Sequence, residues 1–321
     1  MMYNNLGKTG IKVSHVSLGG AVPTSFREFD ESRGIDLIKA TLKSGINYLE
    51  TGPWYGQGTS ERTIGKALQG VSRESYFIGS KVGRYEKETD RMFDFSAEKT
   101  EVSVDQTLQR LGLDYVDIIQ VHDVTFAPDI SVVIKETLPV LEKAVSDGKA
   151  RFIGIADYDI DLMQEIVEES DVKISTVLSY AKSTLIDNRL QNYTRYFEVN
   201  NLLKYLIKVL SMLPRLEWGF SQIKVRNRGT RIVLIFQTEN VELARLATWF
   251  TLNQPGVHTH VCGFYNSEQL LDTLQVLKTG LTEHEKTVLS NIKTNEISKL
   301  ATLLMTLTLA CRVVNCHDLL K

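Results

Sequence analysis

The sequence predicts an α/β protein whose main part is a (β/α)8 barrel. Short runs rich in β-branched and aromatic residues alternate with amphipathic helical patterns, at intervals suited to repeated βα units. The chain has 321 residues, 43% of them hydrophobic and 24% charged, which is enough to bury the core of one barrel. Residues able to do acid–base chemistry follow three of the apolar runs, where such barrels carry their active sites.

Each element of the barrel follows from these patterns in turn. The strands are expected at residues 13–18, 46–50, 76–81, 116–121, 151–155, 175–179 and 259–263. The helices are expected at residues 30–43, 60–68, after Ser96, and at 131–147, 161–169, 188–199, 239–250 and 267–277. The seventh strand has no clear pattern, so eight units with one altered is the simplest interpretation.

The stretch before the eighth expected strand is atypical. From residue 204 to 231 it carries seven basic residues and one acidic residue, with Trp218 and Phe220 among them. This pattern suits nucleic acid or an anionic membrane surface, but a solvated basic face or an altered reading frame explains it better. The predicted barrel therefore covers residues 1–297, with residues 203–238 as a divergent segment.

Residues 298–321 are expected to form an atypical apolar tail outside the barrel. Its part rich in leucine and threonine, 300–314, has 15 residues. A membrane-spanning helix needs roughly 18 or more. A packed helix or an altered-frame tail is therefore expected rather than a membrane anchor.

Charge and cysteine content restrict the partners. The net charge of −2 creates no field that recruits nucleic acid or a membrane surface, so neither is an expected partner, and we expect a monomer or weak oligomer. Cys262, Cys311 and Cys316 show no disulfide framework and no paired metal-ligand spacing, which indicates reduced thiols and no metal. The N-terminus lacks a basic region followed by an apolar run, so a cytoplasmic protein is expected.

Four candidate catalytic residues lie at or near the ends of three successive strands. Glu50 and Tyr55 follow the second expected strand, Lys81 ends the third, and His122 follows the fourth. Because the carboxyl ends of parallel strands meet at the mouth of a barrel, these side chains are expected to converge. Taken singly, each is more often a packed aromatic, a surface charge or a core histidine. Their joint placement favours catalysis.

Three separated motifs resemble those of the aldo-keto reductase family, in the family's order. They are residues 45–61 (GINYLETGPWYGQGTSE), 78–84 (IGSKVGR) and 111–122 (LGLDYVDIIQVH). The resemblance is greatest to its L-galactose dehydrogenase-like and D-threo-aldose dehydrogenase-like branch, and it runs over residues 6–201 and 240–277. It implies an oxidoreductase that uses NADP or NAD and acts on an aldose or a small aldehyde or ketone.

Carbonyl reduction needs a hydride and a proton, but an unperturbed tyrosine holds its proton until pH ~10. A nearby ammonium favours the phenolate, which assigns Lys81 as the tuner of an acid/base Tyr55. An imidazole orients the substrate oxygen, the role expected of His122. A carboxylate keeps the lysine charged and directed, which assigns Glu50. The expected reaction interconverts an aldose, or a small carbonyl compound, with its lactone or alcohol.

The chain departs from the family at two of these places. The family has aspartate at the position of Glu50, whose extra methylene moves the carboxylate by up to about 1.5 Å. Ala156 stands where the family commonly has a serine that binds the nicotinamide carboxamide, with Asp157 beside it as a further candidate. A tolerated small residue and a solvated loop carboxylate are the alternatives there. Reduced rather than absent activity is expected.

The adenosine end of the cofactor is expected near the eighth strand and the helix after it. The candidate residues there are Gly263, Tyr265, Asn266, Gln269 and Asp272. Backbone amides at a helix start suit a phosphate, and Tyr265 is placed to stack on adenine, although an ordinary capped helix is the alternative. The segment 263–272 has no lysine or arginine for a 2′-phosphate, and no Gly/Pro-rich pyrophosphate clasp is recognisable in 203–238. The competing hypothesis is a catalytically weak or dead barrel with a binding or regulatory role.

Overall fold

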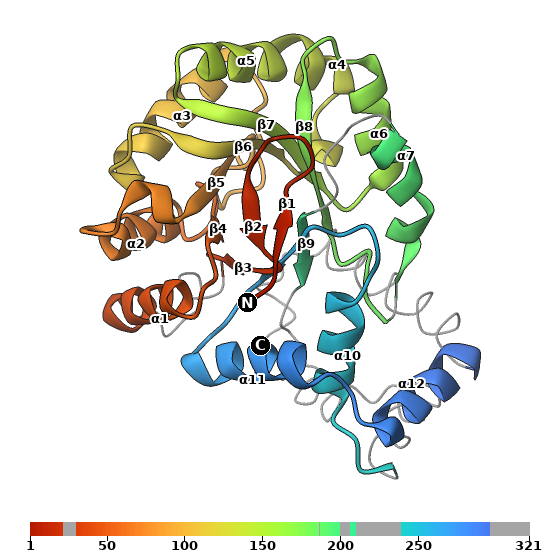
Figure 1. Ribbon diagram of the computed structural model, residues 1–321. Coiled ribbons are helices and arrows are strands. Elements are labelled where there is room, and N and C mark those ends of the chain that lie inside the picture. Colours follow the sequence, from red (N-terminus) through yellow and green to blue (C-terminus); the bar gives the residue numbers. More distant parts are fainter. Residues whose placement is uncertain (22–29, 186, 200–205, 210–238, 296–321) are drawn as a thin grey trace. The chain divides into compact units, whose positions relative to one another are not determined.

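The structure is a computed structural model of the 321-residue chain. It describes residues 1–21, 30–185, 187–199, 206–209 and 239–295 (Figure 1). The chain divides into two compact units. The first contains Met1–Lys182, Arg189–Ser211 and Gln254–Asp272, and the second contains Ser183–Asn188, Met212–Asn253 and Thr273–Lys321.

The first unit is built on a closed barrel of parallel strands, which confirms the predicted fold class. In barrel order the strands are β3 (Val16–Gly19), β4 (Tyr48–Glu50), β5 (Phe77–Val82), β6 (Val116–His122), β7 (Ala150–Asp157), β8 (Ile174–Tyr180), β9 (Leu206–Val209) and β10 (Thr259–Cys262). Pairing of β10 with β3 closes the ring. The strand that lacked a clear sequence pattern is β9, which pairs with β8 and β10.

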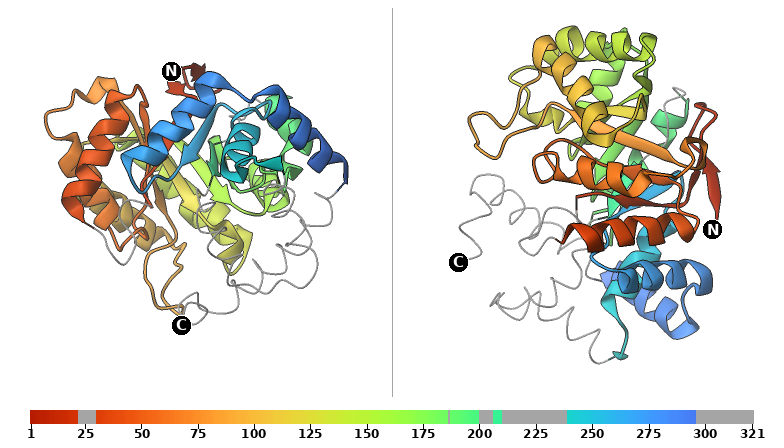
Figure 2. Two further views of the ribbon diagram at one scale, coloured as in Figure 1. Left: turned by 90° about the horizontal axis from the view of Figure 1, so that it is seen from below. Right: turned by 90° about the vertical axis from the view of Figure 1, so that its left-hand side faces the viewer.

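Helices of the first unit lie outside the strands (Figure 1; Figure 2). They are α1 (Glu31–Lys43), α2 (Thr59–Leu68), α3 (Ala97–Leu111), α4 (Ile130–Val132), α5 (Leu138–Ser146), α6 (Ile160–Glu169) and α7 (Thr194–Val199). Ser96 caps α3 as predicted, because its hydroxyl accepts from the Lys99 amide at 3.3 Å. The helix expected at 131–147 is interrupted by a π-helical stretch, Val133–Thr137, just before Pro139, which has no amide hydrogen to donate.

A two-stranded hairpin closes the N-terminal end of the barrel. The single strand expected at 13–18 is wrong, because the chain forms β2 (Lys12–Ser14), paired with β1 (Tyr3–Asn5), before β3 begins at Val16. The Ser14 amide donates to the Asn47 side chain at 2.7 Å, which fixes the hairpin at the start of β4. Leu6, Ile11 and Val13 are buried in the barrel's core cluster with Tyr48. Periodicity did not show this break because a single residue, His15, separates the two strands.

Two glycines give the barrel interior room for larger neighbours. A Cβ atom at Gly79 would lie 2.2 Å from the Tyr48 hydroxyl, so the glycine leaves space for that buried ring. A Cβ atom at Gly154 would lie 1.9 Å from the Thr176 hydroxyl and 3.0 Å from its carbonyl. Because protein interiors are densely packed, a side chain at either glycine would displace its neighbours.

The second unit has its own apolar cluster and helices. α10 (Leu243–Leu252) and α12 (Glu283–Asn295) belong to it, and α11 (Ser267–Thr279) begins in the first unit and ends in the second. Its cluster contains Leu185, Val241, Leu246, Phe250, Leu281, Val288 and Leu289. Arg245 on α10 donates to Glu285 on α12 at 2.7 Å. The sequence patterns did not indicate α12.

Two expectations fall on residues that are not described. The segments 210–238 and 296–321 lie outside the described residues, so the lack of a pyrophosphate clasp and the apolar tail remain predictions, as does the division at residue 297. Within the described part of the chain, no helix is long and apolar enough to cross a membrane.

We predict that Gly154→Ala destabilises the barrel by about 1–3 kcal/mol, because the new methyl group overpacks the interior. Denaturant unfolding measures the loss. Adding Thr176→Ala removes the closest clashing atom and is expected to recover part of it, since residues in contact are energetically coupled. Strictly additive losses in the double variant would contradict this account of the packing.

Candidate active site

A buried ion pair lies at the mouth of the barrel. Glu50 ends β4 and Lys81 lies near the end of β5, and their side chains are both fully buried and in direct contact. The Lys81 ammonium also donates to the Thr51 carbonyl at 2.7 Å. Gly52 packs against the stem of Lys81, because a Cβ atom there would lie 3.5 Å from the Lys81 Cβ. The extra methylene of Glu50 therefore does not prevent the predicted pairing.

Tyr55 lies beside this pair, in the loop between β4 and α2. The Lys81 Nζ atom is 4.7 Å from the centroid of the Tyr55 ring. The ring is buried, with 3% of its surface exposed. The Tyr55 amide donates to the Gly52 carbonyl, and the Ser60 amide donates to the Tyr55 carbonyl, each at 3.1 Å. The loop thus holds the phenol between the ion pair and the start of α2.

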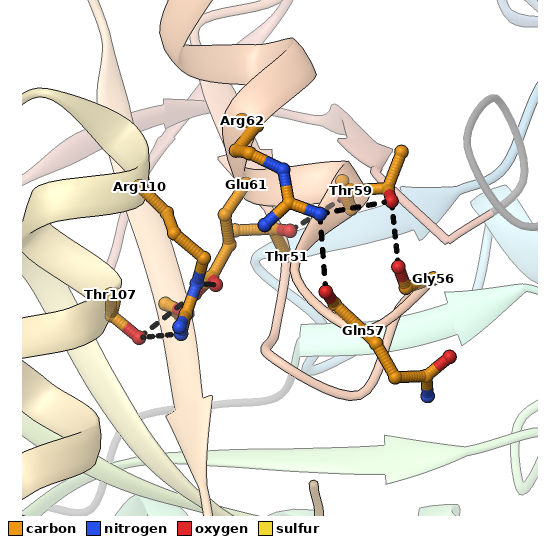
Figure 3. Close-up of polar contacts among 10 residues, drawn as sticks. Thr51, Gly56, Gln57, Thr59, Glu61, Arg62, Thr107 and Arg110 are labelled. Carbon is orange, nitrogen blue, oxygen red and sulfur yellow. Dashed lines mark hydrogen bonds and ion pairs between the residues drawn. The ribbon is translucent and has the colours of Figure 1, made fainter. Parts of the chain in front are cut away.

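Figure 3 shows how the same loop is held from outside. Arg62 donates to the Gln57 carbonyl and the Thr59 hydroxyl, both at 3.2 Å, and Thr59 donates to the Gly56 carbonyl at 2.7 Å. Gln57 has a positive φ of 47°, an uncommon conformation for a residue with a side chain. The guanidinium of Arg62 holds this tight turn two residues after Tyr55.

A second buried carboxylate, Glu61, joins three elements behind the site (Figure 3). It accepts from Ser80 on β5 at 2.7 Å, and from Thr107 and Arg110 on α3 at 2.9 and 2.5 Å. Ser80 precedes Lys81 directly, so Glu61 fixes the strand that carries the lysine. Sequence reasoning quoted Glu61 within a motif but gave it no role.

His122 ends β6 and completes the predicted group. Its ring lies edge-on to Tyr55, with centroids 5.7 Å apart and planes at 82°. It is 2% exposed. The structure therefore brings Tyr55, Lys81, His122 and Glu50 together at the carboxyl ends of three neighbouring strands. Their chemical roles remain predictions.

Four residues that sequence reasoning did not select also lie here. The Asp123 carboxylate is 3.6 Å from His122 Nε2 and pairs with the Arg84 guanidinium at 2.6 Å. That guanidinium lies over the Trp54 ring at 3.6 Å. The ring of Tyr180, the last residue of β8, is 6.2 Å from that of His122. Asp123, Arg84 and Trp54 adjoin or belong to the quoted motifs, which is the only signal that could have found them.

The environment of Tyr55 keeps its phenol protonated. Burial has the largest effect and raises its pKa above the ordinary value, and the negative charge of Asp123 raises it further. The positive charge of Arg84 and a hydrogen bond from Tyr180 lower it. A protonated phenol beside a histidine is suited to donate a proton to a developing alkoxide.

Two predicted cofactor residues lie at the end of β7. Ala156 is fully buried in the barrel core. Asp157 accepts from the Thr125 amide and hydroxyl at 2.8 and 2.6 Å, and from the Asp159 amide at 2.7 Å. These bonds make Asp157 a residue that fixes the loops after β6 and β7. Contact of either residue with a cofactor remains a prediction.

The other predicted cofactor residues gather between β10 and the first turns of α11. Gly263 is buried, whereas Tyr265 is 40% exposed. Asn266 caps the helix by accepting from the Gln269 amide at 3.0 Å, and the Gln269 side chain accepts from the Tyr265 amide at 2.9 Å. Asp272 is exposed one turn further along. An exposed aromatic ring on a fixed loop fits the adenine end of a dinucleotide, and its binding there remains a prediction.

The model of the aldo/keto reductase family matches residues 15–202. The chain belongs to the aldo/keto reductase family. The match covers the strands that carry Glu50, Lys81 and His122, and the loop that carries Tyr55. Members of this family are oxidoreductases that use NADH or NADPH.

Relatives and solved structures agree with this assignment. The chain is 29% identical to L-galactose dehydrogenase of Arabidopsis thaliana over 279 residues, covering 83% of this chain and 84% of the relative. It is 25% identical to D-threo-aldose 1-dehydrogenase of a Pseudomonas species over 291 residues, covering 81% and 88%. An aldo-keto reductase structure from Bacillus halodurans has a TM-score of 0.74 at 23% identity and covers 94% of this chain and 97% of that chain. The structural likeness supports the barrel fold.

We predict that Arg110→Gln lowers the free energy of unfolding by about 2 kcal/mol, because it leaves the buried Glu61 carboxylate without its cation. Arg62→Gln is the matched control, since Arg62 is exposed and donates hydrogen bonds to the neighbouring loop rather than to a buried carboxylate. Its expected cost is about 0.5 kcal/mol or less. Equal losses in the two variants in urea unfolding would argue against a structural role for the Glu61–Arg110 pair.

Proposed function

We propose that the protein is an NAD(P)-dependent oxidoreductase that interconverts an aldose, or a small aldehyde or ketone, with its lactone or alcohol. The observation that carries this proposal is the fully buried Glu50–Lys81 pair beside the Tyr55 ring, with His122 edge-on to the same ring. Burying a lysine is costly unless its charge is paired. This costly buried pair lies at the barrel mouth, where barrel enzymes carry their active sites.

The four residues have distinct roles in this proposal. Tyr55 is the acid/base, His122 donates to the substrate oxygen, Lys81 supplies positive charge beside the phenol, and Glu50 holds the lysine in place. A bound nicotinamide cofactor supplies or accepts the hydride. In oxidation, the C1 carbon of the sugar loses a hydride to the cofactor, and the proton of the C1 hydroxyl passes to the Tyr55 oxygen. The product is the lactone. Reduction reverses both transfers and ends with the proton on the alcohol oxygen.

The substrate class rests on the relatives. Those cited above are named for the oxidation of L-galactose and of D-threo-aldoses. We therefore place a small sugar first, with other small carbonyl compounds as further candidates. The cytosol remains the proposed compartment, because three cysteines are too few for the disulfide framework of a small secreted protein.

The cofactor is proposed to bind with its adenosine end near Tyr265, Asn266 and Gln269, at the start of α11. Asp272 and Gly263 complete this proposed contact, and Ala156 and Asp157 would face the nicotinamide end. The exposed Tyr265 ring offers a stacking surface. Because residues 263–272 contain no lysine or arginine, NAD is favoured over NADP at this end.

We predict that Tyr55→Phe lowers turnover at least about a thousandfold while nucleotide binding is nearly unchanged, because the variant loses a transferable proton and little surface. Tyr76→Phe is the matched control, since Tyr76 is also a buried tyrosine but packs beneath Arg73 rather than at the site. Aldose-dependent NAD(P)H formation and nucleotide titration measure the two quantities. Full turnover in Tyr55→Phe would overturn the proposed role of Tyr55.

A second prediction concerns Glu50, where the family has aspartate. Glu50→Asp is expected to raise turnover severalfold, because catalytic groups misplaced by about 1 Å lose rate steeply. Glu50→Gln is expected to lower it by about a hundredfold or more, since the buried ammonium loses its counter-charge. Steady-state rates of the parent and both variants make the comparison. Equal, near-zero rates in all three would leave the non-catalytic hypothesis standing.

A further inference from the structure

A third buried carboxylate lies next to the proposed catalytic histidine. The Asp123 side chain is 3% exposed, and one of its oxygens is 3.6 Å from His122 Nε2. Its backbone has a φ of 54°, and its amide donates to the Ala156 carbonyl at 2.7 Å. Left-handed backbone at a residue with a side chain costs free energy and gathers at functional sites. The fold therefore holds this carboxylate at the site against a conformational cost.

Arg84 is fixed on the other side of Asp123. It donates to Asp123 at 2.6 Å, and its guanidinium lies over the Trp54 ring at 3.6 Å and the Phe93 ring at 5.3 Å. Residue 84 also forms an isolated bridge with Phe93. Trp54 immediately precedes Tyr55, so the arginine joins the loop of the phenol to the carboxylate beside the histidine. Only 21% of the Arg84 side chain is exposed, which limits solvent screening of its charge.

We propose that Asp123 and Arg84 are paired positioning residues that set the pH at which Tyr55 gives up or takes its proton, each charge acting against the other. The proposal rests on the proposed function of Tyr55. It goes beyond that function because it assigns the pH range of the reaction to a pair outside the four predicted residues. Replacing either charge alone leaves its partner uncompensated, and replacing both restores neutrality.

The charged and titratable groups around Tyr55 come from the strands β4 to β8 and the residues that follow them. They are Glu50 from β4, Lys81 and Arg84 from β5 and the loop after it, His122 and Asp123 from β6 and the residue after it, Tyr158 after β7, and Tyr180 from β8. Asp123 is the charged residue that raises the pKa of Tyr55 most after burial, and Arg84 lowers it. Opposite effects from the two members of one ion pair distinguish an electrostatic role from a structural one.

The test is the pH dependence of aldose oxidation, which requires the deprotonated phenol and so rises with pH. Asp123→Asn removes the negative charge at nearly constant shape and is expected to move the midpoint of the rise down by about one pH unit. Arg84→Gln removes the positive charge and is expected to move it up by a similar amount. The double variant is expected to return to roughly the parent midpoint, because the two changes cancel.

Two further variants keep the test decisive. Arg84→Lys retains the charge without the planar fork and is expected to keep the parent midpoint. Arg91→Gln is the matched control, since it also removes a positive charge from the segment after β5, but Arg91 is exposed and forms an exposed ion pair with Glu88. It is expected to leave the midpoint unchanged. Nucleotide titration of each variant tests whether the fold and the cofactor site persist.

The outcomes separate this inference from the proposed function. Midpoints of Asp123→Asn and Arg84→Gln that move in the same direction, or that do not move, overturn the inference while Tyr55 remains the acid/base. If Arg84→Gln does not fold, the shift in Asp123→Asn with none in Arg84→Lys decides the question. Near-zero parent turnover, or full turnover in Tyr55→Phe, overturns the proposed function and this inference with it.

Discussion

The buried contact between Lys81 and Glu50 is the constraint on which the rest of the barrel mouth depends. Both side chains are fully buried, and taking two charges out of water costs several kcal/mol per ion before their attraction offsets it. The attraction offsets this cost only if the two side chains are well placed and their remaining polar atoms are hydrogen-bonded. The Thr51 carbonyl takes one ammonium hydrogen, and Gly52 leaves room for the lysine stem. Tyr55 lies beside this paired charge, with the Lys81 Nζ atom 4.7 Å from the centroid of its ring.

Buried carboxylates paired with a cation recur around the site. Glu61 and Asp123 are buried carboxylates like Glu50, and each has its own cation, Arg110 for one and Arg84 for the other. Each pair also joins separate elements, α2 to α3 in one case and the segments after β5 and β6 in the other. Because a buried charge without its partner is strongly destabilising, these pairs resist small displacements of the loops they join. Rigid loops are what a reaction requiring close approach of several groups needs.

The sequence predicted the barrel and the convergence of four residues because both follow from strand order. A short run rich in β-branched apolar residues, such as Val116–His122, favours a buried parallel strand, and the ends of parallel strands meet at one edge. It did not predict contacts between loops. Arg84 and Asp123 meet where the backbone of Asp123 turns left-handed and the Arg84 guanidinium lies over the Trp54 ring, and neither feature has a sequence pattern that predicts it. The hairpin before β3 was missed for a related reason, since periodicity does not reveal a one-residue break at His15.

The burial of these charges also bears on whether the barrel is catalytic. Replacing a buried ion pair by well-packed apolar residues is often neutral or stabilising. A barrel kept only for its fold or for binding thus has no physical need for Glu50, Lys81, Asp123 and Arg84 at one end. At the opposite end Asp117 is paired with Arg73 and Arg151, but it also accepts from the Ile78 amide and so serves the sheet itself. The mouth pairs instead surround a phenol and an imidazole, which favours their retention for proton transfer.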